Sequence, residues 1–206
     1  MSYVFLGDSI TAGSSSPFSF TEYMDKDDIY NFGISGTTVG EYSIYPVDGY
    51  SLLATYDKIP ELRNADEIFL EYGCNDVSAI MCGFTTLQTV IVSFVKAVDG
   101  IRQLNPNAEI NFLSIAKPYG IIINEFAKYQ VDYLSNDYFK GYDFNFPVNL
   151  WAQHYTDFVT GASKRCDKVI PMIEDVHFFD KYIAEDNLHP NGAGHKVIAQ
   201  TIQKYI

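Results

Sequence analysis

Two short segments near opposite ends of the 206-residue chain carry side chains that could perform nucleophilic catalysis. GDSIT at residues 7–11 supplies Ser9, and DNLHPN at residues 186–191 supplies Asp186 and His189. In a turn, residues three apart face the same way, so Asp186 can accept a hydrogen bond from one imidazole nitrogen and fix the tautomer. The other nitrogen can then remove a proton from a serine hydroxyl. Taken singly, each segment also fits a helix-capping residue in a surface turn.

Two further segments could supply hydrogen-bond donors to a negatively charged intermediate. In NFGISGTT (31–38), two glycines three apart let the backbone approach a ligand closely, and in GCND (73–76) the side chain of Asn75 could donate to an oxyanion. A tight turn and a helix cap are the alternatives. Neither glycine cluster contains GxGxxG or a P-loop, which disfavours a nucleotide- or phosphate-binding domain. Ser35 lacks the second glycine of a GxSxG nucleophile elbow and is interpreted as a turn residue.

GDSIT, NFGISGTT and GCND each follow an apolar run, and such runs predict parallel strands covered on both faces. The runs span residues 3–6, 29–32, 68–72, 110–115 and 169–170. Helical patterns lie between them, most clearly over 87–101, with further helices expected over 150–164 and 192–205. This alternation predicts a three-layer α/β/α domain with a central parallel sheet, in which ligand sites lie at the carboxyl ends of the strands.

Together, GDSIT, NFGISGTT, GCND and DNLHPN are similar to the four signature blocks of SGNH hydrolases, the superfamily of GDSL-like lipases and esterases, in the family's order. The resemblance implies the flavodoxin-like SGNH hydrolase fold and ester hydrolysis through an acyl-enzyme. It also implies that Ser9 is the nucleophile, His189 the base and Asp186 its partner. The N–H groups of Ser9 and Gly36 and the side chain of Asn75 would form the oxyanion hole.

Composition argues against several classes of partner. The net charge is -12 and Lys and Arg form no cluster, so neither nucleic acid nor an anionic membrane surface is an expected partner. We expect a protein without a signal peptide, cytoplasmic or a domain of a larger exported or virion protein; its oligomeric state is open. Three cysteines give no disulfide framework, and without acid–histidine clustering beyond Asp186 and His189 we expect neither cofactor nor catalytic metal. His195, on the last predicted helix, should be hydrogen-bonded or exposed.

An aromatic-rich region in the second half of the chain bears on the choice of substrate. We expect a single domain over residues 1–206 with an aromatic-rich insertion around 124–148, where Tyr133, Tyr138 and Tyr142 could stack on sugar rings. This favours a small acyl ester, such as an O-acetyl group on a carbohydrate. Packing of these rings onto the scaffold is the alternative. Lipase, lysophospholipase and thioesterase activities remain open, as does a carbohydrate-binding module with little catalysis, although the intact triad and Asn75 count against the last.

Overall fold

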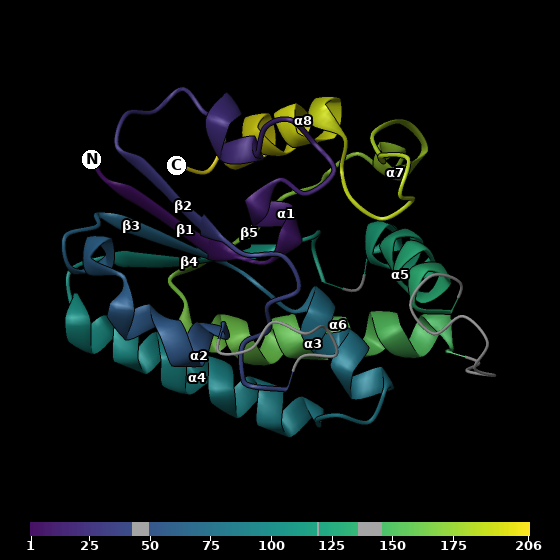
Figure 1. The fold of residues 1–206 in the computed structure, drawn as a ribbon, viewed down its shortest axis with the longest axis horizontal. Coiled ribbons are helices and arrows are strands. Elements are labelled where there is room, and N and C mark those ends of the chain that lie inside the picture. Colours follow the sequence, from purple (N-terminus) through teal and green to yellow (C-terminus); the bar gives the residue numbers. More distant parts are fainter. Residues whose placement is uncertain (43–49, 119, 136–145) are drawn as a thin grey trace.

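The computed structural model describes residues 1–42, 50–118, 120–135 and 146–206. At its centre lies a five-stranded parallel sheet with the strand order β2-β1-β3-β4-β5 (Figure 1). The strands are β1 (Tyr3–Gly7), β2 (Ile29–Gly33), β3 (Glu67–Glu71), β4 (Glu109–Ser114) and β5 (Lys168–Pro171). Each strand overlaps the apolar run that predicted it, so the predicted parallel α/β sheet is confirmed.

Helices on both faces of the sheet complete the three layers. On one face, α8 (Gly192–Ile202) packs against the 3-10 helix η1 (Phe20–Tyr23); on the other, α4 (Leu87–Leu104) packs against α6 (Val148–Ala162) (Figure 1). The structure also contains α1 (Ser9–Ala12), α2 (Leu52–Thr55), α3 (Cys74–Met81), α5 (Ile121–Tyr133) and α7 (Phe178–Lys181), with the 3-10 helices η2 (Tyr56–Lys58), η3 (Pro60–Arg63) and η5 (Ser163–Arg165).

Aromatic rings fill both spaces between the sheet and its helices. Phe5 stacks on Phe69 at a centroid distance of 4.5 Å and meets Phe20 of η1 edge to face. On the opposite face, Phe112 of β4 meets Phe158 of α6 edge to face at 5.8 Å. All these rings are fully buried, and each favourable pair contributes about 0.5–1.5 kcal/mol beyond its buried area. The sheet is therefore held rigidly from both sides.

The strand register brings the predicted functional segments to one edge of the sheet. Gly7, the last residue of β1, pairs with Gly33 of β2 on one side and with Glu71 of β3 on the other. The loops that follow these three strands therefore leave the sheet at the same level. Since β1 has β2 and β3 as its two neighbours, the chain departs in opposite directions there, which opens a crevice for ligands.

One sequence expectation about elements was wrong. β2, which was expected to be covered on both faces, is half-buried or exposed along its whole length, and Tyr30 is 40% exposed. It lies at the edge of the sheet beside β1.

The region expected to be an aromatic-rich insertion over 124–148 begins inside helix α5 and ends at the start of α6. In α5 the buried residues Ile123, Phe126, Ala127 and Val131 form an apolar stripe. Residues 136–145, between the two helices, lie outside the described residues.

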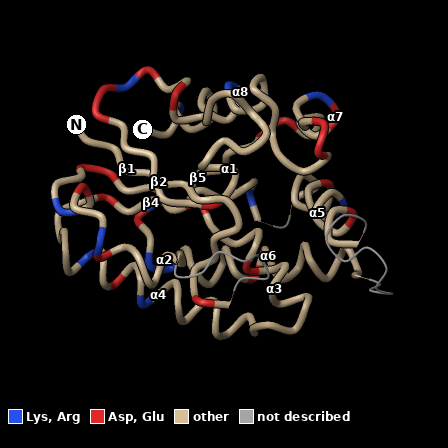
Figure 2. Tube along the Cα trace, in the orientation of Figure 1, with Lys and Arg blue, Asp and Glu red and all other residues tan. Residues whose placement is uncertain are grey.

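Charge and hydropathy give the surface its general character. In the described part of the chain, Lys and Arg are scattered among the more numerous Asp and Glu (Figure 2). No helix formed by the described residues is both long enough and apolar enough to span a bilayer.

Candidate active site

Ser9, His189 and Asp186 form a continuous hydrogen-bonded chain at the carboxyl edge of the sheet. Ser9 is the first residue of α1, directly after β1, and its Oγ lies 2.8 Å from Nε2 of His189. Nδ1 of the same ring lies 2.6 Å from Oδ2 of Asp186. The structure therefore brings together the three residues that the sequence singled out for nucleophilic catalysis.

The ionisation of Asp186 fixes the direction of these hydrogen bonds. Burial opposes ionisation, but hydrogen bonds from the Ser15 hydroxyl, from His189 and from the N–H of Leu188 outweigh it and lower the pKa of Asp186 to about 2. The carboxylate must therefore accept a hydrogen bond from Nδ1–H of His189. Nε2 is left as the acceptor for the Ser9 hydroxyl, which is the arrangement a general base requires.

The turn that carries Asp186 and His189 is closed by its own backbone. Ile183 and Pro190 form an antiparallel bridge, and the N–H of Ala184 donates to the carbonyl of His189 at 2.8 Å. Asn187, at the tip, has φ 55°, a left-handed conformation that asparagine tolerates better than most residues. The chain then enters α8, where Asn191 accepts from the N–H of Gly194.

Close contact with neighbouring atoms explains why a glycine, Gly7, lies two residues before Ser9. A Cβ at Gly7 would lie 2.1 Å from Oγ1 of Thr11 and 2.8 Å from the carbonyl oxygen of Glu71, so no larger residue fits. Asp8 caps α1 by accepting from the N–H of Ile10 at 3.0 Å. This cap fixes the position at which Ser9 starts its short helix.

The groups expected to form the oxyanion hole border the same cavity as Ser9. Gly36 lies in the loop after β2 with φ 80°, and Asn75 lies in the first turn of α3, 8% exposed. Nδ2 of Asn75 donates to the carbonyl of Thr37 at 2.9 Å and, more weakly, to Oδ2 of Asp8 at 3.3 Å. The amide is thereby held in one orientation.

The cavity beside Ser9 is small and partly open. It measures about 190 Å³, and among the described residues it is lined by Ser9, Ser35, Gly36, Asn75, Tyr133, Leu188 and His189. Tyr133, at the end of α5, is thus the one residue of the three proposed aromatic contacts that the structure describes, and it reaches the cavity. Tyr138 and Tyr142 lie outside the described residues.

Buried acidic residues behind the cavity were missed by sequence reasoning. Oδ1 of Asp76 accepts from the N–H of Val39 and the hydroxyl of Tyr42, both at 2.9 Å, and burial raises the pKa of Asp76 to about 7. Glu71 contacts Asp8 at the end of β3. The sequence signal that could have indicated Glu71 is its position inside the apolar run 68–72, because an acidic residue in such a run is buried with its neighbours.

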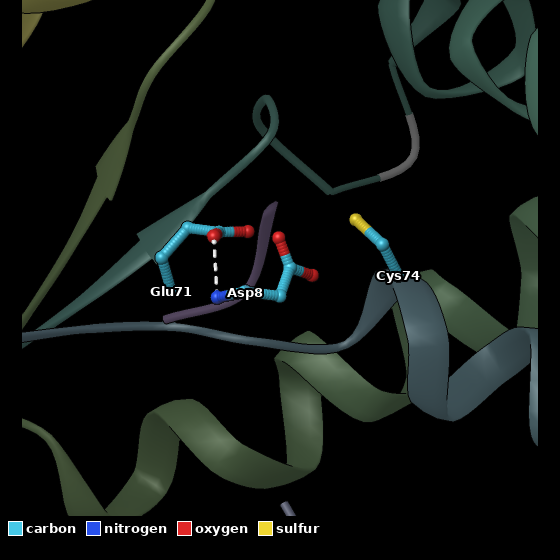
Figure 3. A group of neighbouring side chains, drawn as sticks. All are labelled: Asp8, Glu71 and Cys74. Atoms are coloured by element: carbon cyan, nitrogen blue, oxygen red, sulfur yellow. Dashed lines mark hydrogen bonds between the residues drawn. The ribbon is translucent and has the colours of Figure 1, made fainter. Parts of the chain in front are cut away.

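Asp8, Glu71 and Cys74 are the described residues that could hold a metal ion, since their ligand atoms lie within 4.8 Å of one another and all three are buried (Figure 3). Burial, followed by the nearby carboxyl groups, raises the pKa of the Cys74 thiol well above its usual value. Three of the four carboxyl oxygens of Asp8 and Glu71 already accept hydrogen bonds from N–H or O–H groups. These donors occupy positions that a metal ion would need, so the cluster does not fit a resident metal site.

His195 contradicts the expectation that it would be hydrogen-bonded or exposed. Its side chain is fully buried, and within the part of the chain that the structure describes neither ring nitrogen has a hydrogen-bond partner. The ring stacks on Phe20 of η1 at 6.3 Å. Burial, with a smaller contribution from the charge of His189, lowers the pKa of His195 to about 4, so the ring is neutral near pH 7.

Comparison with known proteins gives one family and one fold. The model of the GDSL-like lipase/acylhydrolase family matches residues 5–197. No curated protein sequence matches the chain. The chain is similar in structure to the lipase Lip_vut3 from a goat rumen metagenome, with a TM-score of 0.65 and 15% identity over 99% of this chain and 96% of the other.

Two carbohydrate esterases share the fold with similar TM-scores and sequence identities. An acetyl xylan esterase, AlAXEase, gives a TM-score of 0.65 and 15% identity, with both chains covered completely. An active-site mutant of a family two carbohydrate esterase from Clostridium thermocellum gives 0.60 and 15% identity over 100% of this chain, which spans 62% of that protein. At these identities the likeness concerns the fold.

Proposed function

Because the chain belongs to the GDSL-like lipase/acylhydrolase family, it is an SGNH hydrolase that acts on ester bonds, and we propose that it is a serine esterase with Ser9 as its nucleophile. The observation that carries this proposal is the hydrogen-bonded chain from Ser9 Oγ through His189 to an ionised Asp186. A serine hydroxyl is a weak nucleophile by itself, and a neighbouring imidazole held in the correct tautomer is what activates it.

In the proposed reaction, Nε2 of His189 takes the hydroxyl proton as Ser9 Oγ forms a bond to the acyl carbon. Asp186 stabilises the imidazolium that results. The carbonyl oxygen becomes an oxyanion and accepts hydrogen bonds from the N–H groups of Ser9 and Gly36 and from Nδ2 of Asn75. His189 then protonates the departing alkoxide as the C–O bond breaks. Water repeats the sequence on the acyl-enzyme, releases the carboxylic acid and restores Ser9.

The substrate we propose is a small acyl ester, with an O-acetyl group on a carbohydrate as the preferred case. A cavity of about 190 Å³ is smaller than the roughly 300–1,000 Å³ of pockets that enclose drug-sized ligands, so it suits a short acyl group. Tyr133 borders the cavity and offers a ring on which a sugar can stack. The fold serves an acetyl xylan esterase and a family two carbohydrate esterase as well as a lipase, so the preference for a carbohydrate ester rests on the cavity and on Tyr133.

The first experiment compares Ser9→Ala with Ser35→Ala, because both serines border the cavity. With p-nitrophenyl acetate, Ser9→Ala should lose at least roughly a thousandfold in kcat, whereas Ser35→Ala should keep most of its activity. A fluorophosphonate should label Ser9, as located by peptide mapping. Label on Ser35, or an active Ser9→Ala variant, would refute the proposed nucleophile.

A second experiment addresses the substrate. Acetyl, butyryl and octanoyl esters should be tested beside acetylated oligosaccharides, and activity should fall as the acyl chain lengthens. A preference for octanoyl esters would favour the lipase alternative, and a thioester preference would favour a thioesterase. Binding of oligosaccharides without turnover of any ester would favour a carbohydrate-binding module.

A further inference from the structure

Two buried carboxyl groups meet directly behind the nucleophile. Glu71 is the last residue of β3, and Asp8 is the first residue after β1, the neighbouring strand in the sheet. Figure 3 shows the side chain of Glu71 directed toward Asp8, with Cys74 close to the carboxyl group of Asp8. Asp8 and Glu71 are each only 1% exposed. Bulk solvent therefore screens their charges little.

Three of the four carboxyl oxygens already accept hydrogen bonds. In Asp8, Oδ1 accepts from the N–H of Ile10 at 3.0 Å and Oδ2 accepts from the side chain of Asn75 at 3.3 Å. In Glu71, Oε2 accepts from the N–H of Asp8 at 3.3 Å and from the hydroxyl of Thr11 at 3.1 Å. Oε1 of Glu71 is fully buried and has no donor among the described residues. An oxygen in that position is best satisfied by a proton that it shares with the neighbouring carboxyl group.

No Lys or Arg in the described part of the chain compensates the charge of the pair. The titratable groups that act on the pair from neighbouring elements are Tyr72, Cys74, Asp76, Tyr155 and His189. The first four are neutral or acidic, and His189 is positive only when it is protonated. Neither Asp8 nor Glu71 forms an ion pair with a described Lys or Arg. Two ionised carboxylates in contact would therefore face each other unscreened, the situation in which a pair of acids retains one proton.

We propose that Asp8 and Glu71 share one proton and that this pair positions Ser9 and Asn75 for catalysis. The catalytic part of the inference rests on the proposed esterase function; the shared proton does not. Burial raises the pKa of both carboxyl groups, and the charge of Glu71 raises that of Asp8 further, which agrees with one retained proton. With a single negative charge on the pair, Asp8 keeps its bonds to Ile10 at the start of α1 and to Asn75.

The shared proton has a consequence for the transition state. Asn75 is hydrogen-bonded to Asp8 and is also the proposed donor to the oxyanion. Asn75 would therefore lie between the Asp8–Glu71 pair and the negative charge that develops during the reaction. A second negative charge on the pair would repel that oxyanion and also separate the two carboxyl groups. Loss of the proton at alkaline pH should therefore lower kcat more than it raises KM. Asp8 and Glu71 are positioning residues in this account, because neither touches the substrate.

The test compares Glu71→Gln and Glu71→Ala, with Glu67→Gln at the start of the same strand as the matched control. Glutamine can donate one N–H to Asp8 as the shared proton does, and its oxygen can accept from Thr11. Glu71→Ala should lower kcat roughly 10- to 100-fold because Ser9 and Asn75 lose their support, and Glu71→Gln should recover most of that loss. The decline of kcat at alkaline pH should disappear in Glu71→Gln and persist in Glu67→Gln.

A measurement without substrate separates this inference from the proposed function. The infrared difference spectrum between the wild type and Glu71→Gln at neutral pH should contain a protonated-carboxyl C=O band that is missing from the difference spectra of Glu67→Gln and Ser9→Ala. Asp76, whose pKa is about 7, is present in every variant, so its own band cancels in these differences. The proposal is wrong if the Glu71→Gln difference spectrum contains no such band, or if Glu71→Gln damages kcat as severely as Glu71→Ala. Stoichiometric metal in the purified wild type that Glu71→Gln abolishes would also overturn it, since a cation would then bridge the carboxyl groups. An active Ser9→Ala variant would refute the esterase mechanism and leave the band unaffected.

Discussion

Nε2 of His189 lies 2.8 Å from Oγ of Ser9, although 180 positions separate the two residues in the chain. Ser9 starts α1 at the end of β1, whereas His189 lies in the turn before α8. The two meet because α8 packs against η1, which follows α1 closely in the sequence. The geometry of this hydrogen bond therefore depends on how the C-terminal helix docks onto the N-terminal part of the molecule.

Asp186→Asn should reduce kcat by roughly 10³–10⁴-fold. It should also lower the melting temperature, because the hydrogen bonds that lower the pKa of Asp186 favour its ionised form in the folded protein. The neutral amide can donate to Nδ1 of His189, which favours the tautomer that places a proton on Nε2 and blocks acceptance from Ser9. Glu185→Gln, in the same turn and exposed, is the matched control and should retain wild-type kinetics. Steady-state kinetics on p-nitrophenyl acetate decide the matter, and an Asp186→Asn variant with near-normal kcat would contradict the assigned role.

Asn75→Ala should lower kcat by about 10²–10³-fold while changing KM little, because the amide binds a charge that develops only in the transition state. The variant also loses the hydrogen bond to Thr37, so its melting temperature should be recorded beside its kinetics. Asn107→Ala, exposed in the turn before β4, controls for the loss of an amide elsewhere. A rise in KM with unchanged kcat would make Asn75 a ground-state substrate contact instead.

His195→Leu should make the stability of the protein less dependent on pH on the acid side. The folded-state pKa of about 4 lies below the ordinary 6.5, so the folded protein binds the proton more weakly than the unfolded chain does. Stability is therefore fully present above pH 6.5 and is lost as the pH falls towards 4. The shift corresponds to roughly 2–4 kcal/mol in the free energy of unfolding.

The check for His195 is a series of denaturant unfolding curves between these two pH values. His177→Leu, at an exposed histidine beside α7, serves as the control and should follow the wild-type curve. The leucine variant should be at least as stable as the wild type at neutral pH, because two buried ring nitrogens without partners are removed. A variant whose stability still declined as steeply as the wild type's would show that His195 is solvated in the folded protein.

Tyr133→Ala should raise KM for an acetylated oligosaccharide several-fold, which is the effect expected for the loss of one ring contact. The kinetics with p-nitrophenyl acetate should stay almost unchanged. The small aryl ester reacts at Ser9 without extending along the ring of Tyr133. Tyr129→Ala is a strong control, since Tyr129 lies on the same helix but packs on Phe179 at 5.5 Å. If both tyrosine variants merely lowered the melting temperature, α5 would act as scaffold and the preference for a sugar substrate would lose its main support.

Much of the site was predictable because each of its segments follows a predicted strand or precedes a predicted helix. Short apolar runs define parallel strands, and parallel strands end at one edge of a sheet, so Ser9, Gly36 and Asn75 were expected at that edge. The strand order β2-β1-β3, which tertiary packing decides, makes the three residues neighbours. The spacing of Asp186 and His189 determines their hydrogen bond locally. Local periodicity also predicted α4, α6 and α8 to within a few residues.

Tertiary packing alone decided which buried polar side chains contact one another across different helices and strands. The apolar run at 68–72 gave no indication that Glu71 would face Asp8, because that contact depends on β3 lying beside β1. His195 looked like an ordinary helical histidine until α8 buried it against Phe20. Sequence pattern encodes which face of an element is apolar, and hence the layers. The partners of a buried carboxyl or imidazole group are set by how those layers dock, a property of residues distant in the chain.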